Sequence, residues 1–475
     1  MCNMFLKTCS QLVRLVLLTS IGWLSLSGCG GGGGNPVAPG IQITPDTTYG
    51  QQGLTSFVLE ASQGDVRSAV LQADGKLIVA GWRQTAPLPP SIYGGYAAQQ
   101  VLVRRFHGDG SVDTTFGTGG EVRFNVKGSD TVADVKLQAD GKILLAVKAI
   151  EPCLITDFVL SAGMCMNDRG ASAEAVSAVV RLTASGALDA SFGTAGVVQA
   201  PTSTGGLALA VQDDSKILLL RTVSVGRARV FGSMLTRYLP DGSVDSSFNQ
   251  GQPLTSRCAA DGQVLLIQAD GKIVTGGTEN AWYADPTASP GFCLERTLTN
   301  GSQDTGFRAV NLWTNVGSNV DLHALTTLPN GGLLAVGRVC DRSTCGGLAV
   351  HFSADGAVDT TFGDAGVGRI MVDPGFQLNG YVAMSSGDLM FMGYRVLGGA
   401  TGLSSLYQPL WARLDFNGQP ARGFGVNGVL TGTTDPRMPR NVLRDTRGRW
   451  LVVNRTPLPD GNQAGVVMRL VGEAY

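Results

Sequence analysis

The chain has 475 residues with 36 basic and 37 acidic side chains, and its formal net charge is −1. Because nucleic-acid-binding proteins need a dominant basic surface, this balance argues against a nucleic-acid partner. Charged residues make up only 15% of the chain and glycine contributes 66 residues, a composition that suits tight turns in a rigid, weakly charged β-sheet protein.

Residues 1–28 have the layout of an export signal. Lys7 and Arg14 supply the positive region, and residues 15–26 supply an apolar region that is too short to span a bilayer as a helix. The sequence Leu-Ser-Gly-Cys, which ends at Cys29, resembles a bacterial lipobox. By that resemblance the signal is removed and Cys29 becomes the lipidated first residue. An ordinary cleaved signal with an incidental cysteine is the alternative.

Residues 29–46 are expected to hold the lipidated cysteine and a flexible linker. Five consecutive glycines and an Asn-Pro-Val-Ala-Pro-Gly segment follow Cys29, and such a stretch cannot bury enough apolar surface to fold. Position 30 is Gly rather than the Asp that is associated with inner-membrane retention in enteric bacteria, which favours the outer membrane. We therefore expect a lipid-anchored protein of the bacterial cell envelope that contacts the membrane only through its anchor.

Aromatic residues recur at intervals over the rest of the chain. They lie mostly in the pattern Asp-x-x-Phe-Gly-x-x-Gly, and successive positions are 55 to 76 residues apart, which indicates a propeller or another repeat array. The seven positions are Tyr49, Phe116, Phe192, Phe248, Phe307, Phe362 and Phe424. We interpret these side chains as core residues between repeats.

Each repeat predicts four short antiparallel strands. Runs rich in Val, Leu, Ile and Phe alternate with Asp-Gly or similar turns, as at Asp74-Gly75 and Asp109-Gly110, and show no helical period. In the first repeat the expected strands a, b, c and d are residues 66–72, 76–82, 101–106 and 121–126. Seven four-stranded sheets arranged around an axis make an all-β, seven-bladed β-propeller, here over residues 47–475.

The two ends of the repeat array predict closure of the ring. The last repeat supplies strands a and b within residues 441–455 and strand c at residues 465–470, but no aromatic segment follows. The missing piece lies at the other end, as Tyr49 followed by residues 54–59. We expect this N-terminal strand to be strand d of the last blade, because pairing the two ends removes an open sheet edge. Six blades with frayed ends are the alternative.

A second repeated feature is an arginine eight residues before an aspartate, so that the two face each other across the c–d turn. The pairs are Arg105/Asp113, Arg181/Asp189, Arg237/Asp245 and Arg296/Asp304. His351 takes the arginine position in one repeat, and Arg413 meets Ala421 in another, where the pair is lost. Because each arginine comes with its own aspartate, we interpret the pairs as structural. A ring of anion-binding arginines is the alternative.

The repeat resembles the delta-60 repeat, a bacterial β-propeller repeat without an assigned activity. Residues 71–81 together with 105–120 carry the resemblance most clearly, and residues 137–142, 181–196, 267–277 and 351–366 are further matches. Departures from the pattern include Arg308, which follows Phe307, and the alanine at position 421. The resemblance implies a propeller over nearly the whole mature chain and brings no catalytic or cofactor residues.

Six cysteines remain in the mature chain besides Cys29, an even number for an oxidising compartment. In the propeller they all fall at the end that carries the b–c loops, and this placement predicts three disulfides. The pairs are Cys153–Cys165, Cys258–Cys293 and Cys340–Cys345. A zinc site is the alternative, but zinc needs four nearby ligands and these cysteines come in twos from separate blades.

The b–c loops vary most in length and composition, and variable loops on a rigid scaffold are where binding usually occurs. Several carry aromatic residues that suit contacts with a protein or with sugar rings. The candidate binding residues are Tyr93, Tyr96, Trp282, Tyr283, Tyr407 and Trp411. The alternative is that these rings only cover the loops' own cores.

Two functions from different classes remain. The first is a monomeric, non-enzymatic binding or scaffold module for an envelope protein or glycan, with no cofactor and no metal. The second is an envelope enzyme that uses the central channel. Enzymes need convergent acid–base groups or metal ligands. Of the three histidines, His107 lies beside a turn and His351 takes an arginine position, so His323 alone could face the channel. We find no catalytic constellation and favour the first function.

Overall fold

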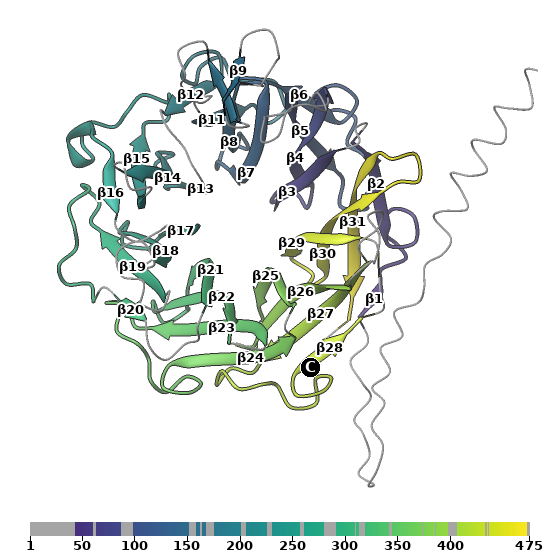
Figure 1. The fold of residues 1–475 in the computed structure, drawn as a ribbon, viewed down its shortest axis with the longest axis vertical. Coiled ribbons are helices and arrows are strands. Elements are labelled where there is room, and N and C mark those ends of the chain that lie inside the picture. The colour runs from purple at the N-terminus through teal and green to yellow at the C-terminus, as the bar shows by residue number, and fades with distance from the viewer. Residues whose placement is uncertain are drawn as a thin grey trace, which may run out of the picture.

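The computed structural model describes residues 43–472, apart from residues 60–62, 87–97, 152–157, 162–163, 168–174, 201–205, 226–229, 257–260, 280–290, 309, 313–318, 342–343, 374, 385, 398–405, 433–434 and 436. Within these residues the chain forms seven four-stranded antiparallel blades arranged around an axis (Figure 1). The described part contains one short helix, the 3-10 turn Asn249–Gly251. The predicted all-β, seven-bladed propeller is therefore confirmed.

The first four blades take their strands a to d from consecutive stretches of chain. Blade 1 consists of β3 (Gly64–Leu71), β4 (Leu77–Ala86), β5 (Ala98–Phe106) and β6 (Glu121–Phe124). Blade 2 consists of β7 (Ser129–Leu137), β8 (Ile143–Ile150), β11 (Val176–Leu182) and β12 (Val197–Ala200). Blade 3 consists of β13 (Leu207–Val211), β14 (Ile217–Val225), β15 (Val230–Tyr238) and β16 (Leu254–Ser256). Blade 4 consists of β17 (Asp261–Ile267), β18 (Ile273–Glu279), β19 (Gly291–Thr297) and β20 (Val310–Leu312).

The last three blades continue the same order until the final strand. Blade 5 consists of β21 (Asn319–Thr327), β22 (Leu333–Cys340), β23 (Cys345–Phe352) and β24 (Val367–Asp373). Blade 6 consists of β25 (Gln377–Ala383), β26 (Leu389–Leu397), β27 (Leu406–Leu414) and β28 (Val429–Thr431). Blade 7 takes β29 (Met438–Arg444), β30 (Trp450–Pro457) and β31 (Gln463–Val471) from the C-terminal region and β2 (Leu54–Val58) from the N-terminal region.

The ring closes through the N-terminal segment, as predicted. In blade 7, β2 pairs antiparallel with β31, with Leu54 opposite Met468. A two-residue strand β1 (Thr44–Pro45) also pairs with β31, with Thr44 opposite Val471. Ile43 is buried in the core at the same place. The propeller therefore includes residues 43–46, and the expected boundary at residue 47 is corrected, because these residues are bound to the sheet instead of lying in the linker.

The a strands surround the axis (Figure 1), and most of them are interrupted at the same level. A β-bulge shifts the register between Val66 and Ser68 in β3 and between Leu322 and Ala324 in β21. Among the described strands, β7, β17, β25 and β29 carry a similar irregularity. A bulge leaves one residue outside the ladder and re-aims its side chain, so these positions are distinct from the flat part of each strand.

Two further pairings distinguish the second blade. A single parallel bridge between Gln99 and Ser129 joins the sheets of blades 1 and 2. The connection between β8 and β11 holds an extra hairpin, formed by β9 (Phe158–Ser161) and β10 (Met164–Asn167). This hairpin belongs to the longest predicted b–c loop and is an addition to the repeat.

The hydrophobic core lies between blades, and the repeated aromatic residues are part of it. Phe116 is fully buried in a cluster with Val101 of blade 1 and Leu145 of blade 2. The turn of the next blade covers its ring so closely that a Cβ on Gly186 would lie 2.9 Å from a ring carbon, and Gly186 has a φ of +95° that also favours glycine. The prediction that these aromatic residues are core between blades is confirmed.

Candidate functional site

The propeller has two unlike faces. The a–b and c–d turns lie at one face, which we call the turn face, and an example is the pair of turns at Asp74-Gly75 and Asp109-Gly110. The b–c connections and the links between successive blades lie at the other, which we call the loop face. The turn face repeats the same polar arrangement from blade to blade, whereas the loop face carries most of the additions to the repeat.

On the turn face, the repeated arginine joins each blade to the next. Arg105 Nε donates to Asp113 Oδ2 at 2.8 Å, and its guanidinium lies 4.7 Å from the centre of the Phe116 ring. Its Nη1 also donates to the carbonyl oxygen of Ala184 in blade 2 at 2.6 Å. A backbone bond from Gly117 N to Ser185 O, at 2.8 Å, runs beside it. The arginine thus uses its charge, its planar face and its spare donors in one buried joint.

The same joint recurs around the ring. The arginines that contact both their aspartate and their aromatic ring are Arg181, Arg237, Arg296 and Arg469. Each of them also donates to a backbone carbonyl of the next blade. The prediction that the Arg/Asp pairs are structural is therefore supported by their contacts, since these donors are used within the protein.

Two joints depart from the pattern and are compensated locally. His351 stacks on the Phe362 ring at a centroid distance of 3.6 Å, so an imidazole takes the place of the guanidinium. Arg413 faces Ala421, as the sequence indicated, but it is not left without an acid. Its Nε donates to Asp388 Oδ2 at 2.7 Å, from the a–b turn of the same blade. In this blade the carboxylate therefore comes from the neighbouring a–b turn, at a position where several other blades carry lysine.

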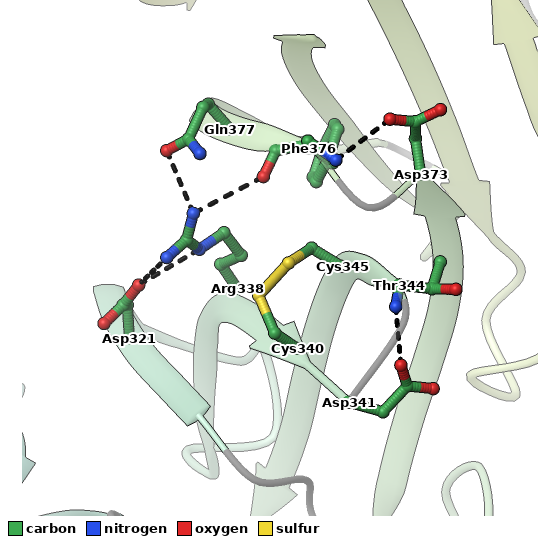
Figure 2. Close-up of a disulfide and its surroundings, with 10 residues drawn as sticks. Asp321, Arg338, Cys340, Asp341, Thr344, Cys345, Asp373, Phe376 and Gln377 are labelled. Carbon is green, nitrogen blue, oxygen red and sulfur yellow. Dashed lines mark hydrogen bonds and ion pairs between the residues drawn. A yellow bond between two sulfur atoms is a disulfide. The ribbon is translucent and has the colours of Figure 1, made fainter.

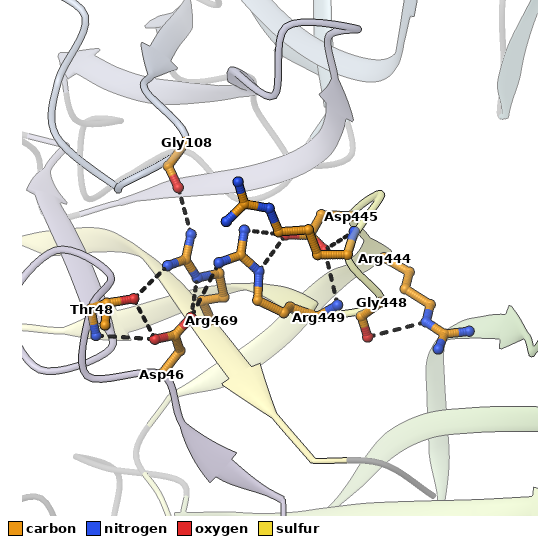
Figure 3. Close-up of polar contacts among 9 residues, drawn as sticks. Asp46, Thr48, Gly108, Arg444, Asp445, Gly448, Arg449 and Arg469 are labelled. Atoms are coloured by element: carbon orange, nitrogen blue, oxygen red, sulfur yellow. Dashed lines mark hydrogen bonds and ion pairs between the residues drawn. The ribbon is translucent and has the colours of Figure 1, made fainter. Parts of the chain in front are cut away.

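The joint that closes the ring is built by residues from both ends of the fold (Figure 3). Arg469 Nε donates to Asp46 Oδ2 at 2.8 Å, and Arg449 Nη1 lies 3.4 Å from the same oxygen. Arg449 also contacts Asp445 at 2.7 Å. Burial raises the pKa of Asp46, but hydrogen bonds from Thr48 and the charge of Arg469 outweigh it and lower the pKa. The closure is therefore electrostatic as well as hydrophobic.

On the loop face, a disulfide joins the end of β22 to the start of β23. Figure 2 shows this bond between Cys340 and Cys345, which confirms the predicted pair. Beside it, Arg338 Nη2 binds Asp321 Oδ2 at 2.7 Å, and its Nη1 donates to Gln377 Oε1 of blade 6 at 2.9 Å. The b–c turn of blade 5 is thus fixed covalently and linked to the neighbouring blade by a charged hydrogen-bond network.

The other two predicted disulfides remain predictions. Cys293 is buried in β19 and is disulfide-bonded, but Cys258 lies outside the described residues. Cys165 lies in the extra hairpin, and Cys153 lies outside the described residues. The lipidation candidate Cys29 is also outside them.

The candidate aromatic residues divide into three groups. Four of them lie outside the described residues, namely Tyr93, Tyr96, Trp282 and Tyr283. Tyr407 lies at the loop-face end of β27 and is partly buried, with its ring edge-on to Tyr394 at 5.2 Å. Trp411 is only 4% exposed and packs edge-on against Trp450 at 5.8 Å.

The prediction that Trp411 belongs to a binding surface is therefore wrong. It lies within a strand, and strand alternation turns its side chain into the core between blades 6 and 7. Sequence reasoning instead missed two separate exposed apolar residues at the loop face. Val396 and Leu406 are 49% and 44% exposed at the ends of β26 and β27. The sequence signal that could have identified them is that apolar residues stand directly before and after a long segment that contains glycine and serine.

Near the axis, His323 is the bulged residue of β21 and is accessible to solvent. The pKa of its imidazole is lowered, first because the surrounding strands limit its hydration and then because of Arg338, while Asp321 opposes the shift. Among the described residues, no group of three or more His, Cys, Asp or Glu side chains could hold a metal ion. The described residues also contain no helix that is long and apolar enough to cross a membrane.

Comparison with solved structures gives distant likenesses. A polysaccharide lyase, Uly1, is 12% identical, with 86% of this chain and 89% of that chain covered and a TM-score of 0.43. The extracellular domains 1–2 of Drosophila Semaphorin 1a are 8% identical, with 86% and 87% covered and a TM-score of 0.41. These values carry no inference about activity. No curated protein matches the sequence.

A family model gives a more direct likeness. Residues 171–192 and 268–307 match the model described as "Domain of unknown function (DUF5122) beta-propeller". The matched segments contain strand c of blade 2 with its Arg181/Asp189 pair, and strands b and c of blade 4 with the Arg296/Asp304 pair. These two segments are therefore similar to that family's model, and the chain itself is folded as seven blades that its own N-terminal strand closes.

Proposed function

We propose that this protein is a lipid-anchored lipoprotein of the bacterial cell envelope, built from delta-60 repeats and held at the outer membrane through Cys29. In this proposal it is a non-enzymatic binding or scaffold module, and its loop face contacts an envelope protein or glycan. The membrane is contacted only through the lipid.

The position of the N-terminal strand is the observation that carries the proposal. Thr44 pairs with Val471 at the end of strand c of blade 7, which is the turn-face end of that strand. Thr44 therefore lies at the turn face, and we propose that the tether reaches the propeller there. A tether at that face directs the loop face away from the membrane, where a partner can reach it.

The chemistry of the two faces supports the same assignment. The arginines, aspartates and backbone groups of the turn face are largely used in joints between blades. The loop face instead carries the additions to the repeat, namely the extra hairpin and the disulfide-linked turn at Cys340. Variable elements on a rigid scaffold favour recognition.

An envelope enzyme is the alternative function. The observation that favours it is His323, an accessible imidazole with a lowered pKa next to the Asp321–Arg338 pair. A general base needs a second group that acts with it on the substrate. If the alternative holds, His323→Ala would abolish any hydrolytic or lyase activity found with the purified protein.

The proposal can be tested with matched variants on the two faces. The mature chain with Cys29→Ser would be applied to a glycan array and to immobilised envelope proteins. Val396→Asp with Leu406→Asp changes the loop face, and Phe416→Asp with Val426→Asp changes residues that are 62% and 69% exposed near the turn face. We expect binding to fall at least tenfold only in the first variant. Equal binding by both variants would contradict loop-face recognition.

The membrane anchor needs a separate measurement. Metabolic labelling with a radioactive fatty acid should mark the full-length protein, and Cys29→Ser should abolish the label and release the protein from the membrane fraction. An unlabelled protein that stays soluble would support the ordinary cleaved signal. This measurement does not depend on the partner, so the proposed lipid anchor and the proposed loop-face binding are tested independently.

A further inference from the structure

A pocket lies on the turn face where blade 7 meets blade 1. Its volume is about 500 Å³, within the range of sites that hold small molecules. The a–b turn and c–d turn of blade 1 form one side, and the a–b turn of blade 7 forms the other. The polar residues that matter for the argument are Asp74, His107, Asp109, Asp445, Arg447 and Arg449, all of which line it.

The turn of blade 7 carries unusual charges. In blades 1 to 4 the residue at the tip of the a–b turn is an aspartate, at Asp74, Asp140, Asp214 and Asp270. Blade 7 carries Arg447 at this position. The equivalence follows from the turn hydrogen bonds, since Gln72 N donates to Lys76 O at 2.8 Å and Asp445 N donates to Arg449 O at 2.9 Å. The charge at the tip of the a–b turn is therefore negative in blades 1 to 4 and positive in blade 7.

The other charges of the blade 7 turn are already used. Asp445 accepts from Arg449 Nε at 2.7 Å, and its second oxygen accepts from the backbone N–H of Arg447 and of Arg449 at 2.9 Å each. Arg449 also reaches Asp46. Arg447, in contrast, is exposed, and its guanidinium makes no hydrogen bond or ion pair with any residue in the described ranges.

The turn of blade 1 holds an acid, Asp109, that forms hydrogen bonds but no ion pair within the described part of the chain. Asp109 Oδ1 accepts from the backbone N–H and the hydroxyl of Ser111 at 2.8 and 2.7 Å. These hydrogen bonds lower the pKa of Asp109, so it is charged at neutral pH. It forms no ion pair within the described part of the chain, whereas Asp74 is held by Lys76 at 3.2 Å. The pocket is thus lined by one cation, on the turn of blade 7, and one anion, on the turn of blade 1, that form no ion pair with any described residue.

We propose that this pocket binds a small zwitterion, an α-amino acid or a short peptide with free termini. The ligand's carboxylate contacts the Arg447 guanidinium, which matches a carboxylate in shape and charge. Its ammonium group contacts the Asp109 carboxylate. The bound molecule then spans the closure between blades 7 and 1. This site lies on the face opposite the proposed loop-face partner and does not depend on it.

The test uses the mature chain with Cys29→Ser and isothermal titration with alanine and with alanyl-alanine. N-acetylalanine keeps only the negative charge, and alaninamide keeps only the positive charge. We expect a zwitterion to bind at least tenfold more tightly than either single-charge analogue. Alanine and alanyl-alanine distinguish a free amino acid from a peptide as the preferred size. Failure of both zwitterions to bind would overturn the proposal.

Two variants, each of which introduces the residue found at the equivalent position of another repeat, test the proposed ligand contacts of Arg447 and Asp109. Arg447→Asp installs the residue that four other turns carry, and Asp109→Ser installs the residue of the equivalent position in blade 2, Ser185. Both should therefore fold, and thermal denaturation would check this. We expect each to weaken zwitterion binding at least tenfold, while Asp241→Ser in the c–d turn of blade 3 leaves it unchanged. Unchanged binding by the first two variants would also overturn the proposal.

Discussion

The joints between blades predict a large cost for removing one buried arginine. In blade 3, Arg237 Nε donates to Asp245 Oδ2 at 2.8 Å, Nη1 donates to Thr299 O of blade 4 at 2.6 Å, and Nη2 donates to Ser247 Oγ at 3.2 Å. The guanidinium also lies 4.5 Å from the centre of the Phe248 ring. The Arg237→Ala variant loses all four contacts and leaves Asp245, which is only 3% exposed, as a buried acid without its cation.

The expected loss in the free energy of unfolding is about 3–5 kcal/mol. This is the usual cost of removing one partner of a buried ion pair, and most of it comes from the charge that is left unpaired. The double variant Arg237→Ala/Asp245→Ala removes that charge as well. Its loss in the free energy of unfolding should therefore be smaller than the sum of the losses in the two single variants, by about 1 kcal/mol or more. Arg422→Ala, at an exposed arginine, is the matched control and should change stability by about 0.5 kcal/mol or less.

Urea denaturation followed by tryptophan fluorescence would measure these differences. The comparison is valid where the slope of the free energy against urea concentration is the same for each variant, because a changed slope indicates loss of cooperativity between blades. A loss below about 1 kcal/mol for Arg237→Ala would refute the view that these arginines hold the blades together. So would a double variant whose cost equals the sum of the single ones.

Three further predictions concern other stabilising contacts of the fold. Asp388→Lys should destabilise the protein by about 3–5 kcal/mol, because Arg413 is buried and loses its acid, and adding Ala421→Asp should restore most of the loss, as urea denaturation would show. The pKa of Asp113 is about 2, since burial raises it but hydrogen bonds from Thr115 and the charge of Arg105 lower it by more. The folded pKa lies below the unfolded value of about 3.9, so this carboxylate stabilises the fold above about pH 4 and its contribution is lost as the pH falls toward 2. Denaturation at a series of pH values should show that the free energy of unfolding falls less steeply with decreasing pH in Asp113→Asn than in the unchanged protein. Replacing both cysteines of the blade 5 disulfide by serine should cost about 2 kcal/mol, because the closed loop is short, and a larger cost in denaturation experiments would contradict this.

The strand order and the closure of the ring could be predicted because the repeat marks them locally. Asp-Gly turns fix one end of each strand, so the predicted start of strand d at residue 121 agrees with β6. The loop-face ends carry no such mark. Strand c was expected at residues 101–106, but β5 begins at Ala98, because its pairing with β4 continues beyond the repeated motif.

The parts of the site that were missed depend on contacts between distant residues. The Arg105/Asp113 spacing predicted their pairing, yet the third contact, to Ala184 O in the next blade, depends on how two repeats pack. The acid that replaces Asp at position 421 comes from Asp388, on a turn where the repeat has lysine. The sequence assigns Trp411 to a variable b–c loop, whereas it lies in β27, whose register turns its side chain into the core.

The seventh blade joins the closure of the ring to the segment that would follow the proposed tether. In the other blades the c–d connection continues along the chain, whereas in blade 7 the partner of β31 comes from residues 44–58. Force on a membrane tether would therefore act first on the short β1 segment and on the Asp46–Arg469 pair. Ile43 is buried in one cluster with Trp411, Phe424 and Trp450, so apolar packing also holds this segment in place. The contacts that complete the ring would therefore also be the first to resist a pull on the proposed tether, while β2 continues to pair with β31.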